Sequence, residues 1–544
     1  MAFHFDWSVT RRGLQVLLSD PLTSANVTDF MRSLDHLEAQ VYEHQSWLEY
    51  ATYTDPSNGS VRQALSDFKR EVQLEARALI DGCAARIEPH FDALPEAWKP
   101  CLRPFVFRPK YDEAVNQLLA EVSSRSTEFS AIQNAVIYVY PDGTEGNPLD
   151  VRGSPDAQVR ERAHRAMLHA EAQVQGQYVT LFKELHSLRT QAAQQAGYAT
   201  ALDMLWYSED LAERDYGIDE VRRLREQVKT YVCPLLQQIR DYRARLLNTP
   251  TLTPWDAVIG LGGRSLRLQI PEVQATLDEL GQVLLQLSPQ LAHTFSTQRE
   301  ANLYAVAGVN DPYRPGYGNF LPVTGRSWIT CWYANAPETL FILIHEVGHT
   351  LHRAMIGSDK LFRQHFPAVE YAEFVPQFLE VISLPHLTAF FGEEYLQDAQ
   401  LLLLERALGV MVYRALMDEF QEVVYSRVTL DDLDLGALYL ELLAHYPTGI
   451  DHSGLHDLHA VEWVNWHAFM RPFYGIEYVT AWYAALHWFG EALPDQVDAI
   501  FSRSQDATTR NMFDDLGASM CPDNEEFRAW VKAIGEHLVS LTTG

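Results

Sequence analysis

Residues 337–357, PETLFILIHEVGHTLHRAMIG, place His345, Glu346 and His349 in the middle of a mainly apolar segment. Pro337 has the fixed φ that suits the first turn of a helix, and the segment is predicted to be a buried α-helix. Burying imidazole and carboxylate groups costs free energy unless something compensates for the lost water. The predicted helix therefore needs a partner for His345, Glu346 and His349.

The spacing of these three residues predicts a zinc site. His345 and His349 are four positions apart, so both lie on one face of a helix with 3.6 residues per turn. Two such imidazoles can chelate one Zn²⁺ ion, and Glu346 can reach a water molecule bound to that ion. Zinc lowers the pKa of its water, and the carboxylate can take the proton as the water attacks a carbonyl. The alternative is a histidine pair whose hydrogen bonds are satisfied within the core.

A catalytic zinc site needs a third protein ligand and one open position. The spacing of a metzincin would place it at Met355, that of an aminopeptidase at Ala368 and that of thermolysin at Val369, and none of these side chains can serve. The next strong candidates lie on one face of a predicted helix within 367–385. They are Glu370, Glu373, Gln377 and Glu380.

The sequence around these carboxylates indicates that they bind a metal rather than form a solvent-exposed helix face. No Lys or Arg occurs within residues 366–391, so a metal would supply the missing positive charge. Pro376 lies inside the predicted helix and is expected to kink it beside Glu373. The residues alone leave the choice between Glu370 and Glu373 open.

Composition narrows the class of protein. The chain has 544 residues, a formal net charge of −29 and 47% hydrophobic residues, which is typical of an ordered globular protein. Such an acidic chain is not built to neutralise nucleic-acid phosphates. Five dispersed cysteines without a CxxC pair indicate free thiols. With no signal-peptide pattern and no apolar run near the ~20 residues that span a bilayer, we expect a cytoplasmic protein without nucleic-acid or membrane partners.

The pattern of apolar and turn-forming residues along the chain predicts a mostly helical protein with one small sheet. Residues 131–153 show β-rich alternation followed by a turn cluster, which indicates a boundary near 150. We therefore expect an N-terminal helical region at 1–150 and a catalytic metallopeptidase domain at 151–544. Short β-like pieces, SLRLQI and RSWITCWYAN, lie within 250–335, directly before the histidine-containing helix.

The motif HEVGHTLH, with 23 residues between its second histidine and the Glu373 of AEFVPQFLE, resembles that of the thimet oligopeptidase and oligoendopeptidase F group of zinc metallopeptidases. The closest resemblance is to the shorter bacterial oligoendopeptidases and Pz-peptidases. It covers roughly residues 150–490. Further similar segments are SPDAQVRERAHRA at 154–166, AERDYG at 212–217 and WHAFMRPFYGIEYVTAW at 466–482.

The resemblance implies a set of site residues. Glu373 would be the third ligand of one Zn²⁺ ion per chain, and Glu380 would support the ligands. His467, Tyr474 and Tyr478 would bind the substrate carbonyl during catalysis. Relatives carry a second tyrosine where this chain has Gly475, which leaves open which tyrosine acts.

The resemblance also implies a zincin-like, mainly α fold. Two helical lobes would flank a deep substrate channel, with the small β-sheet next to the HExxH helix. The Gly/Tyr/Trp-rich stretch 304–335, with WITCWYAN directly before the HEVGH helix, is similar to the edge strand that pairs with the peptide backbone in that family. A further group of histidines is expected in loops, at the surface or along the channel rather than at a second metal. Its members are His445, His452, His456 and His459.

The function predicted on these grounds is that of a cytoplasmic zinc metalloendopeptidase, a hydrolase that cuts internal bonds of short oligopeptides. Two alternatives remain at this point: a zinc carboxypeptidase of the thermostable Taq type, and a zinc-binding scaffold without catalysis. The Taq-type enzymes carry an HES-x-x-R-like segment where this chain has AEFVPQFLE, which disfavours the first. The sequence leaves the oligomeric state and the cleavage preference open.

Overall fold

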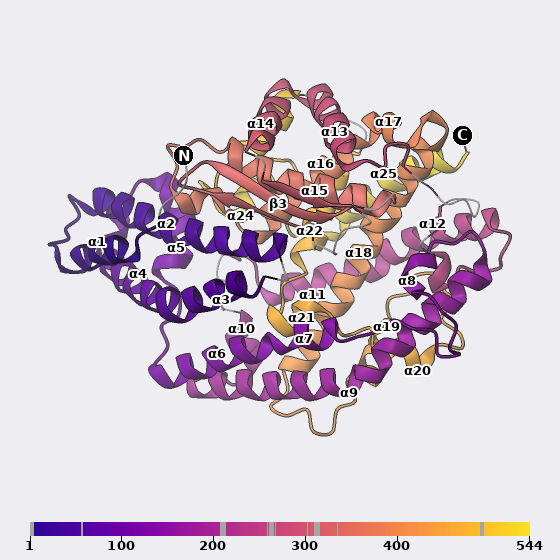
Figure 1. The fold of residues 1–544 in the computed structure, drawn as a ribbon, viewed down its shortest axis with the longest axis horizontal. Helices are drawn as coiled ribbons and strands as arrows, with labels where there is room; N and C mark the ends of the chain where they lie inside the picture. Colours follow the sequence, from indigo (N-terminus) through magenta and orange to yellow (C-terminus); the bar gives the residue numbers. More distant parts are fainter. Residues whose placement is uncertain are drawn as a thin grey trace. The chain divides into compact units, whose positions relative to one another are not determined.

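The computed structural model describes residues 5–55, 58–206, 214–257, 259–260, 266, 268–301, 303–308, 316–333, 336–489 and 494–543. Over these ranges the chain is mainly helical with one three-stranded sheet, as predicted (Figure 1). None of the helices in these ranges combines the length and hydropathy needed to cross a lipid bilayer. Parts of the quoted segments AERDYG, SLRLQI and WITCWYAN lie outside the described residues, namely 212–213, 265, 267 and 334–335.

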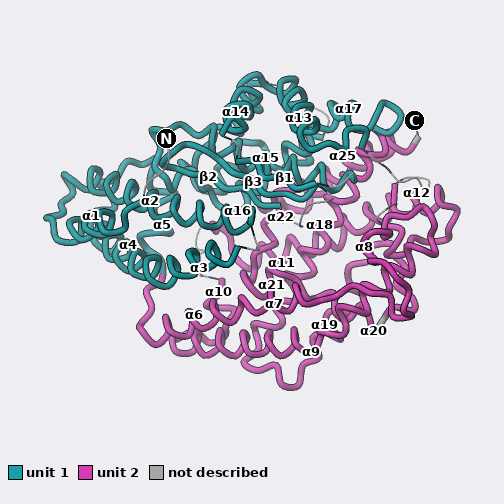
Figure 2. Tube along the Cα trace, in the orientation of Figure 1, with its two compact units in different colours: residues 1–108, 267–396, 484–520 teal, residues 109–266, 397–483, 521–544 magenta. Residues whose placement is uncertain are grey.

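The chain forms two compact units, coloured separately in Figure 2. The first contains residues 1–108, 267–396 and 484–520, and the second contains residues 109–266, 397–483 and 521–544. Both units are mainly helical, in agreement with the predicted two-lobe architecture. The functional division into 1–150 and 151–544, and the channel, stay predictions.

The N-terminal part of the first unit is a helical bundle. Apolar residues of four of its helices, among them Leu14, Phe30, Ile80 and Leu102, share one buried cluster. Its elements are α1 (Trp7–Ser19), α2 (Val27–Thr54), α3 (Gly59–Phe68), a π-helical turn (Lys69–Gln73), α4 (Leu74–Ile87), 3₁₀ turns (Glu88–Ala93, Glu96–Trp98) and α5 (Lys99–Val106).

The rest of the first unit holds the sheet and the helices around it. Its elements are α13 (Val273–Leu287), α14 (Pro289–Glu300), β1 (Tyr304–Ala307), β2 (Tyr317–Leu321), β3 (Arg326–Trp332), α15 (Pro337–Met355), α16 (Val369–Ser383), α17 (Thr388–Phe391), α23 (Pro494–Phe501) and α24 (Thr509–Asp514). Short 3₁₀ turns lie at Phe362–His365, Leu384–His386, Glu393–Tyr395 and Leu486–Trp488.

The sheet has the order β1-β3-β2, with β1 parallel and β2 antiparallel to β3. Residues 327–331 of β3 are all buried, because α15 packs against β2 and β3 (Figure 1). The small sheet before the HEVGH helix is thus confirmed. Within the stretch 304–335, β1 and β2 form the edges of the described sheet, and β3, which contains the described start of WITCWYAN, is its central strand. The pairing of an edge with a peptide backbone stays a prediction.

The second unit contains the two longest helices of the described chain, α9 (Ala157–Gln195) and α18 (Leu396–Tyr425). Its other elements are α6 (Glu113–Ser126), α7 (Glu128–Asn134), α8 (Pro148–Val151), α10 (Ala201–Trp206), α11 (Ile218–Gln227), a π-helical turn (Val228–Val232), α12 (Cys233–Leu246), a 3₁₀ turn (Pro254–Asp256), α19 (Leu435–Leu443), α20 (His456–His459), α21 (Trp466–Met470), α22 (Glu477–Ala485) and α25 (Asn524–Thr543).

The β-rich pattern at 131–153 does not form a strand. Residues 131–134 complete α7, and residues 136–140 are irregular. Ile137 and Val139 are 74% and 52% exposed, so the alternation of apolar side chains has no buried face to occupy. A period of two predicts a strand only where a neighbouring strand and a core accept it.

Candidate metal centre

Helices α15 and α16 of the first unit form the candidate site. Pro337 begins α15, as predicted, and both helices are buried along most of their length. Pro376 lies inside α16, and its missing N–H removes one helical hydrogen bond at that turn. The two helices pack against each other over several turns. Polar residues on the facing sides therefore meet away from bulk water.

The contact between the two helices depends on a residue that the sequence analysis did not single out. Gly348, the glycine of HEVGH, lies against Pro376: a Cβ atom at position 348 would be 2.6 Å from the Cα and 2.9 Å from the Cβ of Pro376. Those distances are shorter than van der Waals contact. One of the two atoms is the backbone Cα of Pro376, which cannot move aside as a flexible side chain can. Glycine at 348 thus lets α16 approach α15 closely enough for its carboxylates to reach the histidines.

We expect Gly348→Ala to destabilise the protein by about 2 kcal/mol or more, because overpacking a rigid contact forces the helices apart. Thermal or denaturant unfolding measures the change. The matched control is Gly176→Ala in α9, where a Cβ would meet nothing within 4 Å. That variant should gain up to ~1 kcal/mol from helix propensity. A stability for Gly348→Ala equal to that of the parent would contradict the packing argument.

Three ligand-type side chains converge between α15 and α16. The Nε2 atom of His345 lies 3.3 Å from Oε2 of Glu373, and the Nε2 atom of His349 lies 3.8 Å from the same oxygen. The ligand atoms of all three residues lie within 4.8 Å of one another. Among the described residues, this is the one group of three or more histidine, cysteine or acidic side chains with such geometry. Glu370 is buried on α16 but does not belong to the group.

This donor set fits a zinc ion. Bonds of about 2.0–2.1 Å to a tetrahedral ion put neighbouring ligand atoms about 3.3–3.4 Å apart. The His345–Glu373 separation of 3.3 Å matches this value, and the His349–Glu373 separation of 3.8 Å is longer. Two imidazoles and one carboxylate are also the ligand types of catalytic rather than structural zinc sites. The residues predicted as ligands, His345, His349 and Glu373, therefore lie where one ion could touch them all.

Glu380 orients one of the rings. Nδ1 of His345 donates a hydrogen bond of 2.9 Å to Oε1 of Glu380, so Nε2 of that ring faces Glu373 as the second nitrogen. Although burial opposes a charge there, hydrogen bonds to Glu373 and Glu380 raise the pKa of His345 to about 10. Burial lowers the pKa of His349 to about 3, which keeps that ring neutral. The carboxylates thus strongly favour a positive charge at His345, and a metal ion would supply it.

Glu346 is the remaining polar residue of the motif. It is 8% exposed, and burial raises its pKa to about 7. Two glycines next to it let the edge strand β2 come close: Cβ atoms at Gly316 and Gly318 would lie 3.3 Å and 3.4 Å from its carboxylate oxygens. A carboxyl group with a pKa near neutrality can both accept and return a proton at physiological pH.

The other predicted site residues lie in the second unit and are brought together there. The ring of His467 on α21 stacks on that of Tyr474, with 5.2 Å between centroids, and the ring of Tyr478 lies 6.4 Å from that of His467. The two tyrosine rings are 6.1 Å apart. Residues up to 11 positions apart in the sequence thus form one aromatic group.

Arg414 on α18 is a member of this group that the sequence analysis missed. Its Nη1 lies 3.1 Å from Nδ1 of His467, and its guanidinium lies 4.7 Å from the ring centroid of Tyr478. A guanidinium group only donates hydrogen bonds, so Nδ1 of His467 accepts and Nε2 carries the hydrogen. A Cβ at Gly475 would lie 3.4 Å from Cδ of Arg414, so Arg414 occupies the space beside this glycine.

Replacing Arg414 by Leu should remove the preference of His467 for the tautomer with hydrogen on Nε2. We expect ¹⁵N NMR of His467 to show Nε2 protonated in the parent and a mixture of both tautomers in Arg414→Leu, because the guanidinium donor to Nδ1 is then gone. Arg406→Leu, on the same helix, is the control and should leave the His467 signals unchanged. A parent spectrum with hydrogen on Nδ1 would contradict the assignment.

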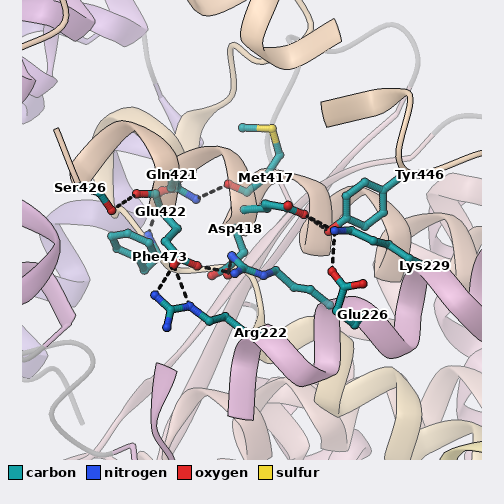
Figure 3. A network of polar contacts seen from close by, with 12 residues as sticks. Arg222, Glu226, Lys229, Met417, Asp418, Gln421, Glu422, Ser426, Tyr446 and Phe473 are labelled. Carbon is teal, nitrogen blue, oxygen red and sulfur yellow. Dashed lines mark hydrogen bonds and ion pairs between the residues drawn. The ribbon is translucent and has the colours of Figure 1, made fainter. Parts of the chain in front are cut away.

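The backbone between His467 and Tyr478 is strained. Phe473 has a φ of 63°, in the left-handed region that costs a non-glycine residue roughly 1–2 kcal/mol. Gln421 compensates by accepting the Phe473 N–H at 2.9 Å, and Arg214 donates to its carbonyl at 2.7 Å. Figure 3 shows Gln421 on α18 beside Phe473, next to the carboxylates of Asp418 and Glu422. This polar network fixes the turn that presents Tyr474.

Of the four histidines expected in loops, at the surface or along the channel, His459 instead lies on the short helix α20 and is buried. It contacts His452, with 2.6 Å between Nδ1 of His452 and Nε2 of His459. Nδ1 of His459 also lies 2.7 Å from Oε2 of Glu462. The neighbours thus occupy opposite sides of the His459 ring, and among the described side chains no three ligands converge there.

Comparison with known proteins agrees with the geometry. No protein-family model matches the chain. Group B oligopeptidase PepB of Streptococcus agalactiae serotype III (strain NEM316) is 21% identical over 351 residues. These make up 63% of this chain and 56% of that protein, so the match spans little more than half of the curated relative.

Among solved structures, an oligoendopeptidase F is similar with a TM-score of 0.87 and 17% identity, covering 99% of this chain and 98% of the other. The chain has the oligoendopeptidase fold. A Pz peptidase A with an inhibitor gives a TM-score of 0.86 at 16% identity and covers 98% of both chains. Metallocarboxypeptidase 1 of Trypanosoma cruzi is less similar, with a TM-score of 0.55 at 12% identity over 99% of this chain and 100% of the other. The resemblance predicted from HEVGHTLH and AEFVPQFLE is therefore confirmed at the level of the fold.

Proposed function

We propose that the chain is a zinc-dependent endopeptidase that hydrolyses internal bonds of short oligopeptides. The observation that carries the proposal is the convergence of His345, His349 and Glu373 beside the buried carboxylate of Glu346. The oligoendopeptidase fold and the similarity to an enzyme named as an oligopeptidase support the same class of substrate.

In this proposal His345, His349 and Glu373 hold the zinc ion, with Glu380 fixing the orientation of His345. The bound ion would polarise the scissile carbonyl and lower the pKa of a water molecule. Glu346 accepts the proton of the attacking water and returns it to the leaving amine. Burial raises the pKa of this carboxyl group, which favours its role as a proton acceptor and donor.

His467 and one of the tyrosines would stabilise the transition state. The Nε2–H that Arg414 enforces on His467 is a hydrogen-bond donor, as are the hydroxyls of Tyr474 and Tyr478. Donors aimed at a developing oxyanion are worth about 2.7–4 kcal/mol each in other enzymes. Tyr474 is the stronger candidate, since its ring stacks directly on His467.

The substrate backbone would pair with β2, the edge strand next to Glu346. Main-chain hydrogen bonds along a strand edge do not depend on side chains, so broad sequence tolerance follows. The glycines at 316 and 318 let this part of the chain lie close to the Glu346 carboxylate.

A peptide blocked at its C-terminal carboxylate separates the endopeptidase from a carboxypeptidase. We expect an amidated oligopeptide to be cleaved at an internal bond at a rate within about threefold of the free acid, because an edge strand does not require a terminal carboxylate. Mass spectrometry of the products measures this. Release of single C-terminal residues, only from the free acid, would contradict the proposal and favour the carboxypeptidase.

A further inference from the structure

The second unit contains a cavity of about 420 Å³ that the proposed chemistry does not use. It is lined by α7, α9, α18, α19 and residues 461–464. Its polar lining consists of Gln133, Glu171, Glu462 and the tyrosines Tyr178, Tyr413 and Tyr439. None of the described residues that line it is Lys, Arg or His. The cavity therefore combines negative charge with aromatic surface.

The two carboxylates are held in place by their neighbours. Glu171 accepts hydrogen bonds from the hydroxyls of Tyr138, at 2.5 Å, and of Tyr178, which orient the carboxylate without neutralising it. Glu462 lies beside the ring of His459. Within the described residues, neither carboxylate forms an ion pair with Lys or Arg. A cation entering the cavity would thus meet two acceptors positioned beforehand.

The tyrosines add to this preference. Tyr178 and Tyr439 are 1% and 3% exposed, so the surrounding side chains hold their rings in place at the edge of the cavity. The hydroxyl of Tyr178 bonds Glu171 and that of Tyr413 bonds Asn465, whereas that of Tyr439 has no hydrogen-bond partner among the described residues. The Tyr439 hydroxyl can therefore accept a hydrogen bond from a ligand N–H. Tyrosine faces also attract guanidinium and ammonium groups.

The cavity lies close to His467 along the chain. Val464 of its wall precedes His467 by three residues, which limits the distance between their Cα atoms to about 11 Å. Tyr413 of the wall is the neighbour of Arg414, which contacts His467. An extended peptide spans that distance with about three residues.

We propose that this cavity is a subsite for a basic side chain, Arg or Lys, of the peptide substrate. The proposal rests on the proposed peptidase function for its role, but not for the binding itself. A volume of 420 Å³ admits one such side chain, and the two carboxylates, the Tyr439 hydroxyl and the ring faces match a guanidinium or ammonium group.

The first test is kinetic. Quenched oligopeptides carry either arginine or its neutral isostere citrulline at each position in turn, and kcat/KM is measured for every pair. At one position we expect arginine to be favoured by roughly tenfold, the effect of one charge-assisted hydrogen bond. Glu462→Gln should remove most of that preference, whereas Glu441→Gln, which removes an exposed carboxylate from α19, should keep it.

Equal rates for arginine and citrulline at every position would overturn the proposal. So would an arginine preference that persists in both Glu462→Gln and Glu171→Gln. Since either substitution could perturb folding, Tyr439→Phe serves as an isosteric third variant and should weaken the preference without changing the thermal transition.

The second test does not require peptide cleavage. Calorimetry with n-butylguanidinium and n-butylurea measures binding to the purified protein. Weak binding of the cation alone, abolished by Glu462→Gln and kept by Glu441→Gln, supports the subsite even if no peptide is cleaved, in which case only the peptidase function fails. Equal binding of both compounds, or binding unaffected by Glu462→Gln, overturns the subsite even where peptides are cleaved.

Discussion

Replacing Glu346 by Gln is expected to leave about one zinc ion per chain and to lower kcat/KM for oligopeptides by roughly 10²–10⁴-fold. The glutamine side chain has nearly the same shape as glutamate, but its amide cannot accept a proton from the attacking water. Because Glu346 is not one of the three converging ligand-type residues, metal content should not change. Elemental analysis and peptide kinetics on the same preparation measure both quantities.

The matched control is Glu338→Gln, which removes an exposed carboxylate from the first turn of the same helix. Its activity should stay within about twofold of the parent, since charges at a helix terminus contribute only ~0.3–1 kcal/mol to stability. A Glu346→Gln variant as active as Glu338→Gln would remove Glu346 from the mechanism. A parent protein that cleaves no oligopeptide while holding zinc would instead favour the non-catalytic scaffold.

Replacing Glu373 by Ala is expected to abolish both zinc binding at micromolar concentrations and activity. Two histidines then remain of the three ligands, and a catalytic zinc needs three. His349→Ala should behave in the same way. Glu380→Gln should weaken zinc affinity by only about 10–100-fold, the usual effect of removing a group that orients a ligand.

The control for Glu373 is Glu370→Ala, three residues earlier on the same helix and equally buried. It should retain about one zinc per chain, because Glu370 lies outside the converging group. Circular dichroism establishes that both variants remain folded. Full metal content in Glu373→Ala together with loss in Glu370→Ala would show that the wrong carboxylate has been assigned.

Periodicity and chemistry predicted the core of the site. The i, i+4 spacing of His345 and His349 places both rings on one face because helical geometry is the same in every protein. The choice of Glu373 over Glu370 came from the resemblance, since both carboxylates fit the residue pattern. In the structure Glu373 is the one that meets the histidines.

Features that depend on tertiary contact were not predictable from the sequence. Gly348 has no pattern of its own, and its role is visible only against Pro376 of the next helix. Arg414 is separated from His467 by 53 residues, so no local signal connects them. The strand predicted before residue 140 does not form. A segment with high strand propensity becomes a strand only beside a neighbouring strand, and this exposed segment has none in the described sheet.

The most direct test of the zinc-peptidase proposal is incubation of the purified protein with a mixed oligopeptide library, read by mass spectrometry, with a chelator and then with zinc restored. The account predicts internal cleavage that the chelator abolishes and zinc restores, since the three converging side chains must hold the ion for water to attack. Cleavage that continues undiminished after complete metal removal, or no cleavage with one zinc bound per chain, would contradict it.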